Sequence, residues 1–176
     1  SVQAGLRFDQ PENKQENMAI KITECPRDAM QGLVDFIPTE TKISYLQQLY
    51  RVGFDVLDCG SFVSPKTIPQ MADSSKVLSH LKREESQTRL SVVVANVRGA
   101  TEACSHENID IVGYPFSISE TFQLKNTNAT IRQSLDRVDG ILKHCIEHDK
   151  TQLIYISMAF GNPYGDKWNE NIAAKW

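Results

Sequence analysis

Alternating strand-like and helix-like segments are the feature of this sequence that most constrains its fold. Five short stretches rich in apolar and β-branched residues recur along the chain, at residues 19–24, 54–59, 90–95, 109–113 and 153–157. The clearest is the nearly continuous β-branched run from Leu90 to Ala95, which is typical of a strand buried on both faces. Regular alternation of strands with helices predicts a parallel sheet with right-handed crossovers. The chain is therefore predicted to be an α/β protein.

The segments between those strands carry apolar residues at helical spacing. Residues 39–51 form one such segment, which stops before Gly53, and residues 130–150 form the longest amphipathic stretch. Shorter or partly helical segments are predicted at 68–85, 99–106 and 168–176. An open doubly wound sheet and a barrel both fit this order. No glycine-rich phosphate-binding motif follows the first strand, so a nucleotide-binding fold has no support, but composition does not separate the two architectures.

Charge and composition exclude several classes of partner. The 176 residues carry a formal net charge of −3, which argues against a nucleic-acid partner because phosphate binding needs a concentrated basic face. No apolar run approaches the roughly 20 residues needed to cross a bilayer, so no membrane partner is expected. Four cysteines are spread along the chain without a metal-binding cluster. Reduced thiols in a cytoplasmic protein are the simplest expectation.

The first residues differ in character from the rest of the chain. Residues 1–17 are largely polar and lack the apolar core of a signal peptide. We interpret them as a flexible tail or a cloning remnant. Residues 18–176 are interpreted as the N-terminal part of one folded domain.

Polar side chains gather where the predicted strands end. They include Arg27, Asp28 and Gln31 after the first strand, Asp58 and Ser61 at the second, and Asn96 after the third. In a parallel α/β fold these strand ends share one rim, where ligands bind. A single polar residue of this kind is more often just a solvated loop residue, but the pattern recurs at strand after strand. It favours a functional site at that rim.

Arg27 and Asp28 are the most informative pair. Adjacent charges of opposite sign most often form a plain salt bridge. Their position at the end of the first strand, with Gln31 one helical turn further on, favours a catalytic role.

The sequence segments around these residues resemble those of a known family. The segment Thr23–Gln31 (TECPRDAMQ) is similar to the signature that opens the metal-dependent acyl-CoA lyases and Claisen-type synthases. Ser61–Lys66 (SFVSPK) and Pro69–Asp73 (PQMAD) narrow this resemblance to the hydroxymethylglutaryl-CoA lyases. Further matching segments lie at residues 96–99, 119–126, 155–157 and 161–164, so the resemblance covers essentially all of residues 18–168.

The resemblance implies a (β/α)8 TIM barrel, of which this chain supplies about the first five βα units. It also implies cleavage of 3-hydroxy-3-methylglutaryl-CoA to acetoacetate and acetyl-CoA, with an acyl-CoA substrate as partner and a homo-oligomeric full-length protein. By resemblance, Asp28 binds a divalent cation (Mg²⁺ or Mn²⁺), Arg27 stabilises the enolate oxygen, and Gln31 supports them. Asp58 and Ser61 line the substrate site. The predicted site is catalytic Arg27 and Asp58, substrate-binding Gln31, Ser61 and Asn96, and metal-binding Asp28.

Elementary chemistry agrees with these roles. A retro-Claisen cleavage must remove a hydroxyl proton and stabilise a thioester enolate. A hard cation with oxygen ligands lowers the pKa of the hydroxyl, and a fixed guanidinium meets the developing oxyanion. Arginine suits this second task better than lysine, because it stays charged and presents a rigid fork.

The chain also departs from the family pattern. Asp58 stands where the family usually carries glutamate, and Ala29 and Gly32 replace its usual glycine and asparagine. No His-x-His metal pair is present, and His144 and His148 lie on a predicted outer helix. We therefore expect a truncated and inactive part of a lyase. Two alternatives remain open, a related Claisen-type synthase and a non-catalytic barrel used for binding or assembly.

Overall fold

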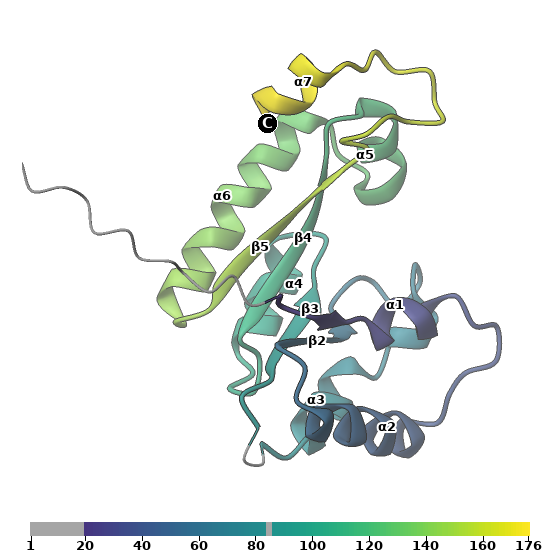
Figure 1. Ribbon diagram of the computed structural model, residues 1–176, viewed down its shortest axis with the longest axis vertical. Helices are drawn as coiled ribbons and strands as arrows, with labels where there is room; N and C mark the ends of the chain where they lie inside the picture. Colours follow the sequence, from purple (N-terminus) through teal and green to yellow (C-terminus); the bar gives the residue numbers. More distant parts are fainter. Residues whose placement is uncertain (1–19, 84–85) are drawn as a thin grey trace, which may run out of the picture.

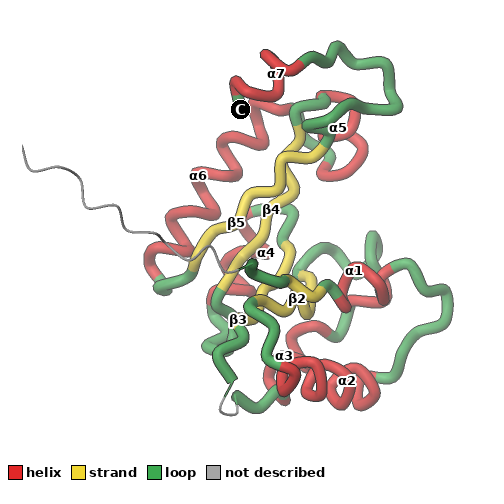
Figure 2. The backbone as a smooth tube through the Cα atoms, viewed as in Figure 1, coloured by secondary structure: helices red, strands yellow, loops and turns green. Residues whose placement is uncertain are grey.

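The computed structural model describes residues 20–83 and 86–176, which fold around one parallel sheet (Figure 1). The sheet has five strands in the order β1-β2-β3-β4-β5, and every neighbouring pair is parallel. The predicted order and direction of the strands are therefore confirmed. The sheet curves into a half-barrel (Figure 2). The predicted tail at residues 1–17 lies outside the described residues.

The strands differ from the predicted ranges chiefly at their ends. They are β1 (Thr23–Glu24), β2 (Val56–Ser61), β3 (Arg89–Val93), β4 (Ile111–Ser117) and β5 (Thr151–Ser157). The first strand is much shorter than predicted, because only Thr23 and Glu24 pair with β2. Just before it, the backbone N–H of Ile22 donates to the Asp55 carboxylate at 2.7 Å. Ile20 is almost fully exposed, so the apolar pattern there has no core to enter.

The main helices occur where helical spacing predicts them. They are α2 (Thr39–Val52), α3 (Ser74–His80), α4 (Val97–Cys104), α6 (Ile131–Glu147) and α7 (Glu170–Lys175), with a 3-10 turn η1 (Pro69–Met71). Two short helices were not predicted, α1 (Pro26–Gln31) and α5 (Glu120–Thr127). Both follow directly after strands and lie at the rim. Among the described residues, no helix is long and apolar enough to cross a membrane.

The two faces of the sheet have opposite characters, because successive side chains of a strand point to opposite sides. Leu90 and Val92 of β3 and Val112 of β4 are completely or almost completely buried and join the apolar core with Leu46 of α2 and Ile141 of α6. Helices α2, α3, α4 and α6 contact the strands and contribute to this core. The other face is concave and faces a cavity. This asymmetry leaves the concave side free for a ligand.

The loop between β5 and α7 is fastened to the start of α5. Asp166 accepts hydrogen bonds from Ser119 Oγ at 2.5 Å and from Thr121 Oγ1 at 2.8 Å. The backbone N–H of Thr121 adds a third, at 3.1 Å. These donors favour the charged form and hold the pKa of Asp166 below its usual range. In the same loop, Trp168 Nε1 donates to the carbonyl of Ala159 at 2.8 Å. The rim beside β5 is therefore shaped by one carboxylate.

The lowered pKa of Asp166 predicts a loop that loosens in acid. Because the folded pKa lies below the unfolded one, this contribution is present above the ordinary aspartate pKa and is lost as pH falls through the folded pKa. In a Trp176→Phe background, we expect Trp168 fluorescence to change below about pH 4. The Asp166→Asn variant should show that altered signal already at pH 7, since one acceptor and the charge are gone. Asp136→Asn, on the exposed side of α6, is the control. Unaltered Trp168 emission in Asp166→Asn would contradict this account.

Candidate active site

Arg27 and Asp28 are placed by the turn from β1 into α1. The helix begins immediately after Cys25, and Pro26 occupies its first turn, where a missing N–H leaves no hydrogen bond unmade. A strand that passes straight into a helix keeps the first helical side chains at the carboxyl end of the sheet. The adjacent pair therefore lies at the rim that parallel α/β folds use for ligands.

A buried ion pair joins α1 to β2. Arg27 Nη2 lies 2.6 Å from Asp58 Oδ2, and Arg27 Nε lies 3.2 Å from both Asp58 carboxylate oxygens. The exposed fractions of the two side chains are 13% for Arg27 and 2% for Asp58. Such a two-pronged contact fixes the plane of the guanidinium as well as its position.

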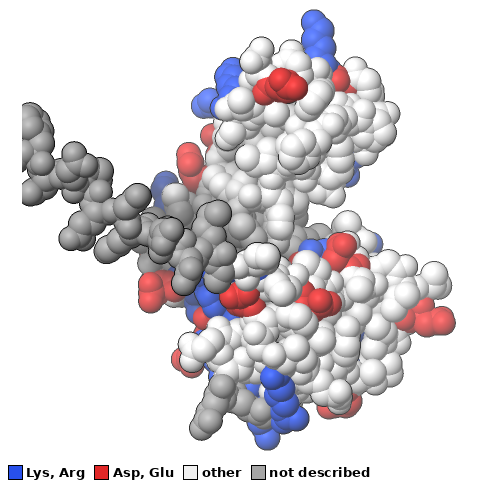
Figure 3. All heavy atoms as spheres, in the orientation of Figure 1, with Lys and Arg blue, Asp and Glu red and all other residues white. Residues whose placement is uncertain are grey.

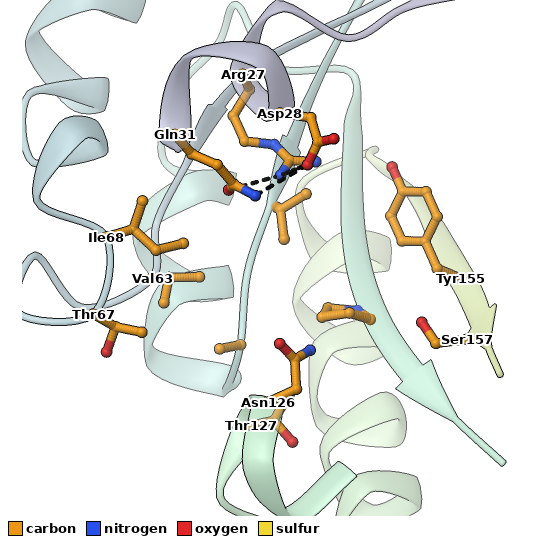
Figure 4. Close-up of a pocket in the computed structure, with 13 residues that line it drawn as sticks. Arg27, Asp28, Gln31, Val63, Thr67, Ile68, Asn126, Thr127, Tyr155 and Ser157 are labelled. Atoms are coloured by element: carbon orange, nitrogen blue, oxygen red, sulfur yellow. Dashed lines mark hydrogen bonds and ion pairs between the residues drawn. The ribbon is translucent and has the colours of Figure 1, made fainter. Parts of the chain in front are cut away.

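The remaining guanidinium nitrogen is held by α1 itself. Arg27 Nη1 donates to Gln31 Oε1 at 2.9 Å and to Asp28 Oδ1 at 3.1 Å, and Gln31 Nε2 donates to the same Asp28 oxygen at 3.0 Å. Figure 4 shows these three side chains turned toward one another at one end of a cavity. Asp28 remains 65% exposed. The structure therefore brings Arg27, Asp28, Gln31 and Asp58 together.

Burial and the ion pair shift the pKa values of Asp58 and Arg27. Burial raises the pKa of Asp58 above its ordinary value, while the ion pair with Arg27 works in the opposite direction. For Arg27, burial lowers the pKa, but the Asp58 carboxylate outweighs it, and the pKa of Arg27 is raised overall. The guanidinium therefore keeps its charge in a nearly dry setting, where its field on a ligand is stronger than in water.

A cavity of about 300 Å³ opens beside this cluster. Apolar side chains from the strands and loops form much of its wall, and polar groups converge from α1, α5 and β5; its lining residues include Arg27, Asp28, Val93, Pro115, Asn126 and Tyr155. The space-filling view shows a notch between the part with α1 and the part with α5 and α7, and charged side chains gather along its border (Figure 3). A mostly apolar hollow with a few convergent polar groups is the usual form of a small-ligand site.

Two predicted substrate residues do not line this cavity. Ser61 is 2% exposed, and its hydroxyl accepts from the backbone N–H of Val63 at 3.2 Å. It borders a separate, smaller hollow. Asn96 caps α4, where its Oδ1 accepts from the N–H of Gly99 at 2.9 Å. Both side chains satisfy backbone groups, which polar residues at strand ends commonly do.

Several lining residues, among them Tyr155, Ser157 and Asn126, were not among the predicted site residues. Tyr155 and Ser157 lie two positions apart on β5 and face the cavity, and Asn126 reaches it from α5 (Figure 4). The period of two along β5 was the available signal, because it places both side chains on one face. Asn126 gave no such signal, because α5 was not predicted.

The described residues do not make up a complete site for a divalent cation. No group of three or more histidine, cysteine, aspartate or glutamate side chains gathers anywhere in residues 20–83 and 86–176. Both oxygens of Asp58 are engaged by Arg27. Asp28 alone offers an accessible carboxylate at the cavity, and a hard cation needs about six oxygen ligands. No chemical step can be derived through a cation from these residues.

Comparisons with known proteins agree on one group of enzymes. No family model matches the chain. The mitochondrial hydroxymethylglutaryl-CoA lyase of Rattus norvegicus is 35% identical over 151 residues, covering 84% of this chain and 45% of the relative. The cytoplasmic 3-hydroxy-3-methylglutaryl-CoA lyase of Danio rerio is 36% identical over 148 residues, covering 82% and 43%. Because the relatives come from two compartments, the predicted location stays a prediction.

Solved structures give the same answer. The lyase of Bacillus subtilis matches with a TM-score of 0.82 and 29% identity, covering 89% of this chain and 52% of that one. A lyase from Acinetobacter baumannii, solved with coenzyme A and 3-methylmalate, matches with a TM-score of 0.81 and 28% identity, covering 88% and 50%. The chain thus spans about half the length of the proteins it matches. By sequence and by fold, it is a relative of the hydroxymethylglutaryl-CoA lyases, and its five parallel strands match about half of their TIM barrel.

Proposed function

We propose that this half-barrel belongs to a carbon–carbon lyase that cleaves 3-hydroxy-3-methylglutaryl-CoA to acetoacetate and acetyl-CoA. The observation that carries the proposal is the immobilised guanidinium of Arg27 at the mouth of a mostly apolar cavity. One solved structure of the same fold contains coenzyme A, which supports an acyl-CoA as the substrate.

The chemistry needs a fixed positive charge. When the tertiary hydroxyl loses its proton, the bond between the hydroxyl-bearing carbon and the thioester arm breaks, and its electron pair moves onto the thioester. Acetoacetate leaves, and the remaining enolate takes up a proton to become acetyl-CoA. Arg27 meets the enolate oxygen, since its charge is held in place before the reaction and needs no rearrangement. The apolar wall excludes water from this charge, which strengthens its effect.

The other side chains of the cluster hold Arg27 and the substrate. Asp58 and Gln31 fix the guanidinium from opposite sides. Asn126 and Ser157 lie further along the cavity, toward α5, and present an amide and a hydroxyl to the polar end of the acyl group. We assign no contact with the substrate to Ser61 or Asn96, because both serve the backbone.

A divalent cation, Mg²⁺ or Mn²⁺, belongs to the proposal for the complete protein. Asp28 would be one of its ligands, and the other ligands would come from outside the described residues. Such a cation would lower the pKa of the substrate hydroxyl. We also propose that the full-length protein is a homo-oligomer.

The absence of a three-residue metal cluster from the described residues favours one alternative, a barrel relative without catalysis. An activity assay of the full-length protein encoded by the natural gene distinguishes a lyase from a non-catalytic relative. We expect acetoacetate to form from 3-hydroxy-3-methylglutaryl-CoA with added Mg²⁺ or Mn²⁺, and the 176-residue chain alone to be inactive. Binding of the thioester by the full-length protein without turnover would support the non-catalytic relative. Condensation of acetyl-CoA with a keto acid would support the synthase.

The first prediction for that protein concerns Arg27. Arg27→Lys should lower kcat by about 10²-fold or more, the scale for loss of an oxyanion donor. Lysine keeps the charge, but its single nitrogen cannot make both the two-nitrogen contact with Asp58 and the contact with Gln31, so the charge is no longer fixed in place. The measurement is kcat, from steady-state kinetics of the variant and of the unmodified full-length protein. The matched control is Arg89→Lys at the opposite end of the sheet, where Arg89 contacts Thr151. Near-normal turnover in Arg27→Lys would exclude the proposed role.

A second prediction concerns Asp28. Asp28→Asn should raise the concentration of Mg²⁺ or Mn²⁺ needed for half-maximal activity, because a carboxylate charge is lost while an oxygen remains. Activity should recover in part at high metal concentration. Titration of Mn²⁺ binding by electron paramagnetic resonance measures the same change without turnover. Asp55→Asn, which alters a carboxylate bound to the N–H of Ile22, is the control. Full activity in excess chelator would argue against any cation.

A further inference from the structure

Tyr155 brings a phenol from the edge strand into the candidate site. It lies on β5, at the opposite end of the five-stranded sheet from β1, and lines the cavity. In Figure 4 its hydroxyl points toward the end of the cavity where Arg27 and Asp28 lie. A side chain from one edge of the half-barrel thus faces groups presented from the other edge.

The ring reaches this position because β4 has no side chain beneath it. A Cβ built on Gly113 would lie 2.9 Å from Tyr155 Cε2 and 3.4 Å from the Tyr155 hydroxyl oxygen. Carbon atoms that are not bonded do not approach so closely, so any side chain at position 113 must displace the ring. Gly113 does not have the positive φ that favours glycine elsewhere in the chain. The glycine is therefore needed here for space.

The surroundings keep the phenol protonated. Burial raises the pKa of Tyr155, and the negative charge of Asp58 raises it further, while Arg27 opposes both. At neutral pH the group is an O–H donor. The buried hydroxyl of Ser91 on β3 lies beside the phenol and also lowers the pKa of Tyr155, without outweighing burial.

We propose that Gly113 is a positioning residue which lets Tyr155 lie across β4, and that the Tyr155 phenol donates a hydrogen bond to the thioester oxygen beside Arg27. The inference rests on the proposed lyase function, which it deepens by a second donor. Two donors that converge on one oxygen, one from helix α1 and one from strand β5, stabilise an enolate better than one.

The kinetic test uses three variants of the full-length protein. Tyr155→Phe removes only the hydroxyl and should lower kcat by about ten-fold or more with little change in KM. Gly113→Ala should lower kcat to a similar extent by displacing the ring. The double variant should be no worse than the poorer single variant, since both changes act on one hydrogen bond. A merely structural role for Gly113 would instead make the losses multiply. Normal turnover in Tyr155→Phe, or multiplied losses in the double variant, would overturn the proposal.

A second measurement does not depend on turnover. The difference in ultraviolet absorbance between the chain and its Tyr155→Phe variant, followed against pH, isolates the titration of this phenol from that of the other tyrosines. We expect a pKa above the ordinary tyrosine value of about 10, and a shift back toward that value in Gly113→Ala. Gly60→Ala is the matched control, because a Cβ there meets only ordinary contacts at 3.4 Å or more.

Negative results in the titration and in the kinetic test contradict different claims. An ordinary Tyr155 titration in the unmodified chain, or one unchanged by Gly113→Ala, would overturn the positioning role of Gly113. If the unmodified full-length protein does not cleave the thioester, the proposed function falls and the substrate contact of Tyr155 falls with it. If it cleaves the thioester and Tyr155→Phe does so equally well, only the further inference is overturned.

Discussion

The buried ion pair between Arg27 and Asp58 is the interaction on which the candidate site depends. It ties a six-residue helix, too short to be stable alone, to the second strand of the sheet. Removing one partner of such a pair leaves an unpaired buried charge, at a cost of about 3–5 kcal/mol. The guanidinium is therefore held by the fold rather than by the ligand. A charge that is already fixed can stabilise a transition state without first being reorganised.

The two faces of the half-barrel have different roles, one in packing and one at the candidate site. Its helix-covered face is filled by apolar side chains such as Leu90 and Val92, which carry the packing energy. Its concave face carries Asp58, Ser91 and Tyr155, side chains that a core would not accept without partners. Because parallel strands bring their carboxyl ends to one rim, residues that lie far apart in the sequence meet there. Packing and chemistry thus occupy alternate positions of the same strands.

The sequence pattern predicted the parts of the fold that long apolar periodicity governs. The strand order and the long helix α6 follow from repeated burial, which periodicity records directly. The first strand was overestimated, because Ile20 is exposed and only Thr23 and Glu24 pair with β2. Helix α1 was missed, since six residues are too few for a period to show. Asn96 was predicted as a substrate residue for a different reason, because a helix cap and a ligand contact need the same kind of side chain.

Asp58 shows how geometry narrows a role that residue type leaves open. A carboxylate at the end of a barrel strand can act as a base, hold a metal or orient a neighbour. Here both oxygens contact the guanidinium of Arg27, and the side chain is almost completely buried. Proton transfer to or from Asp58 would break the ion pair that fixes Arg27. Metal binding would draw on the same oxygens. The arrangement thus favours Asp58 as the residue that orients Arg27, and it leaves the accessible carboxylate of Asp28 as the one free to meet a cation.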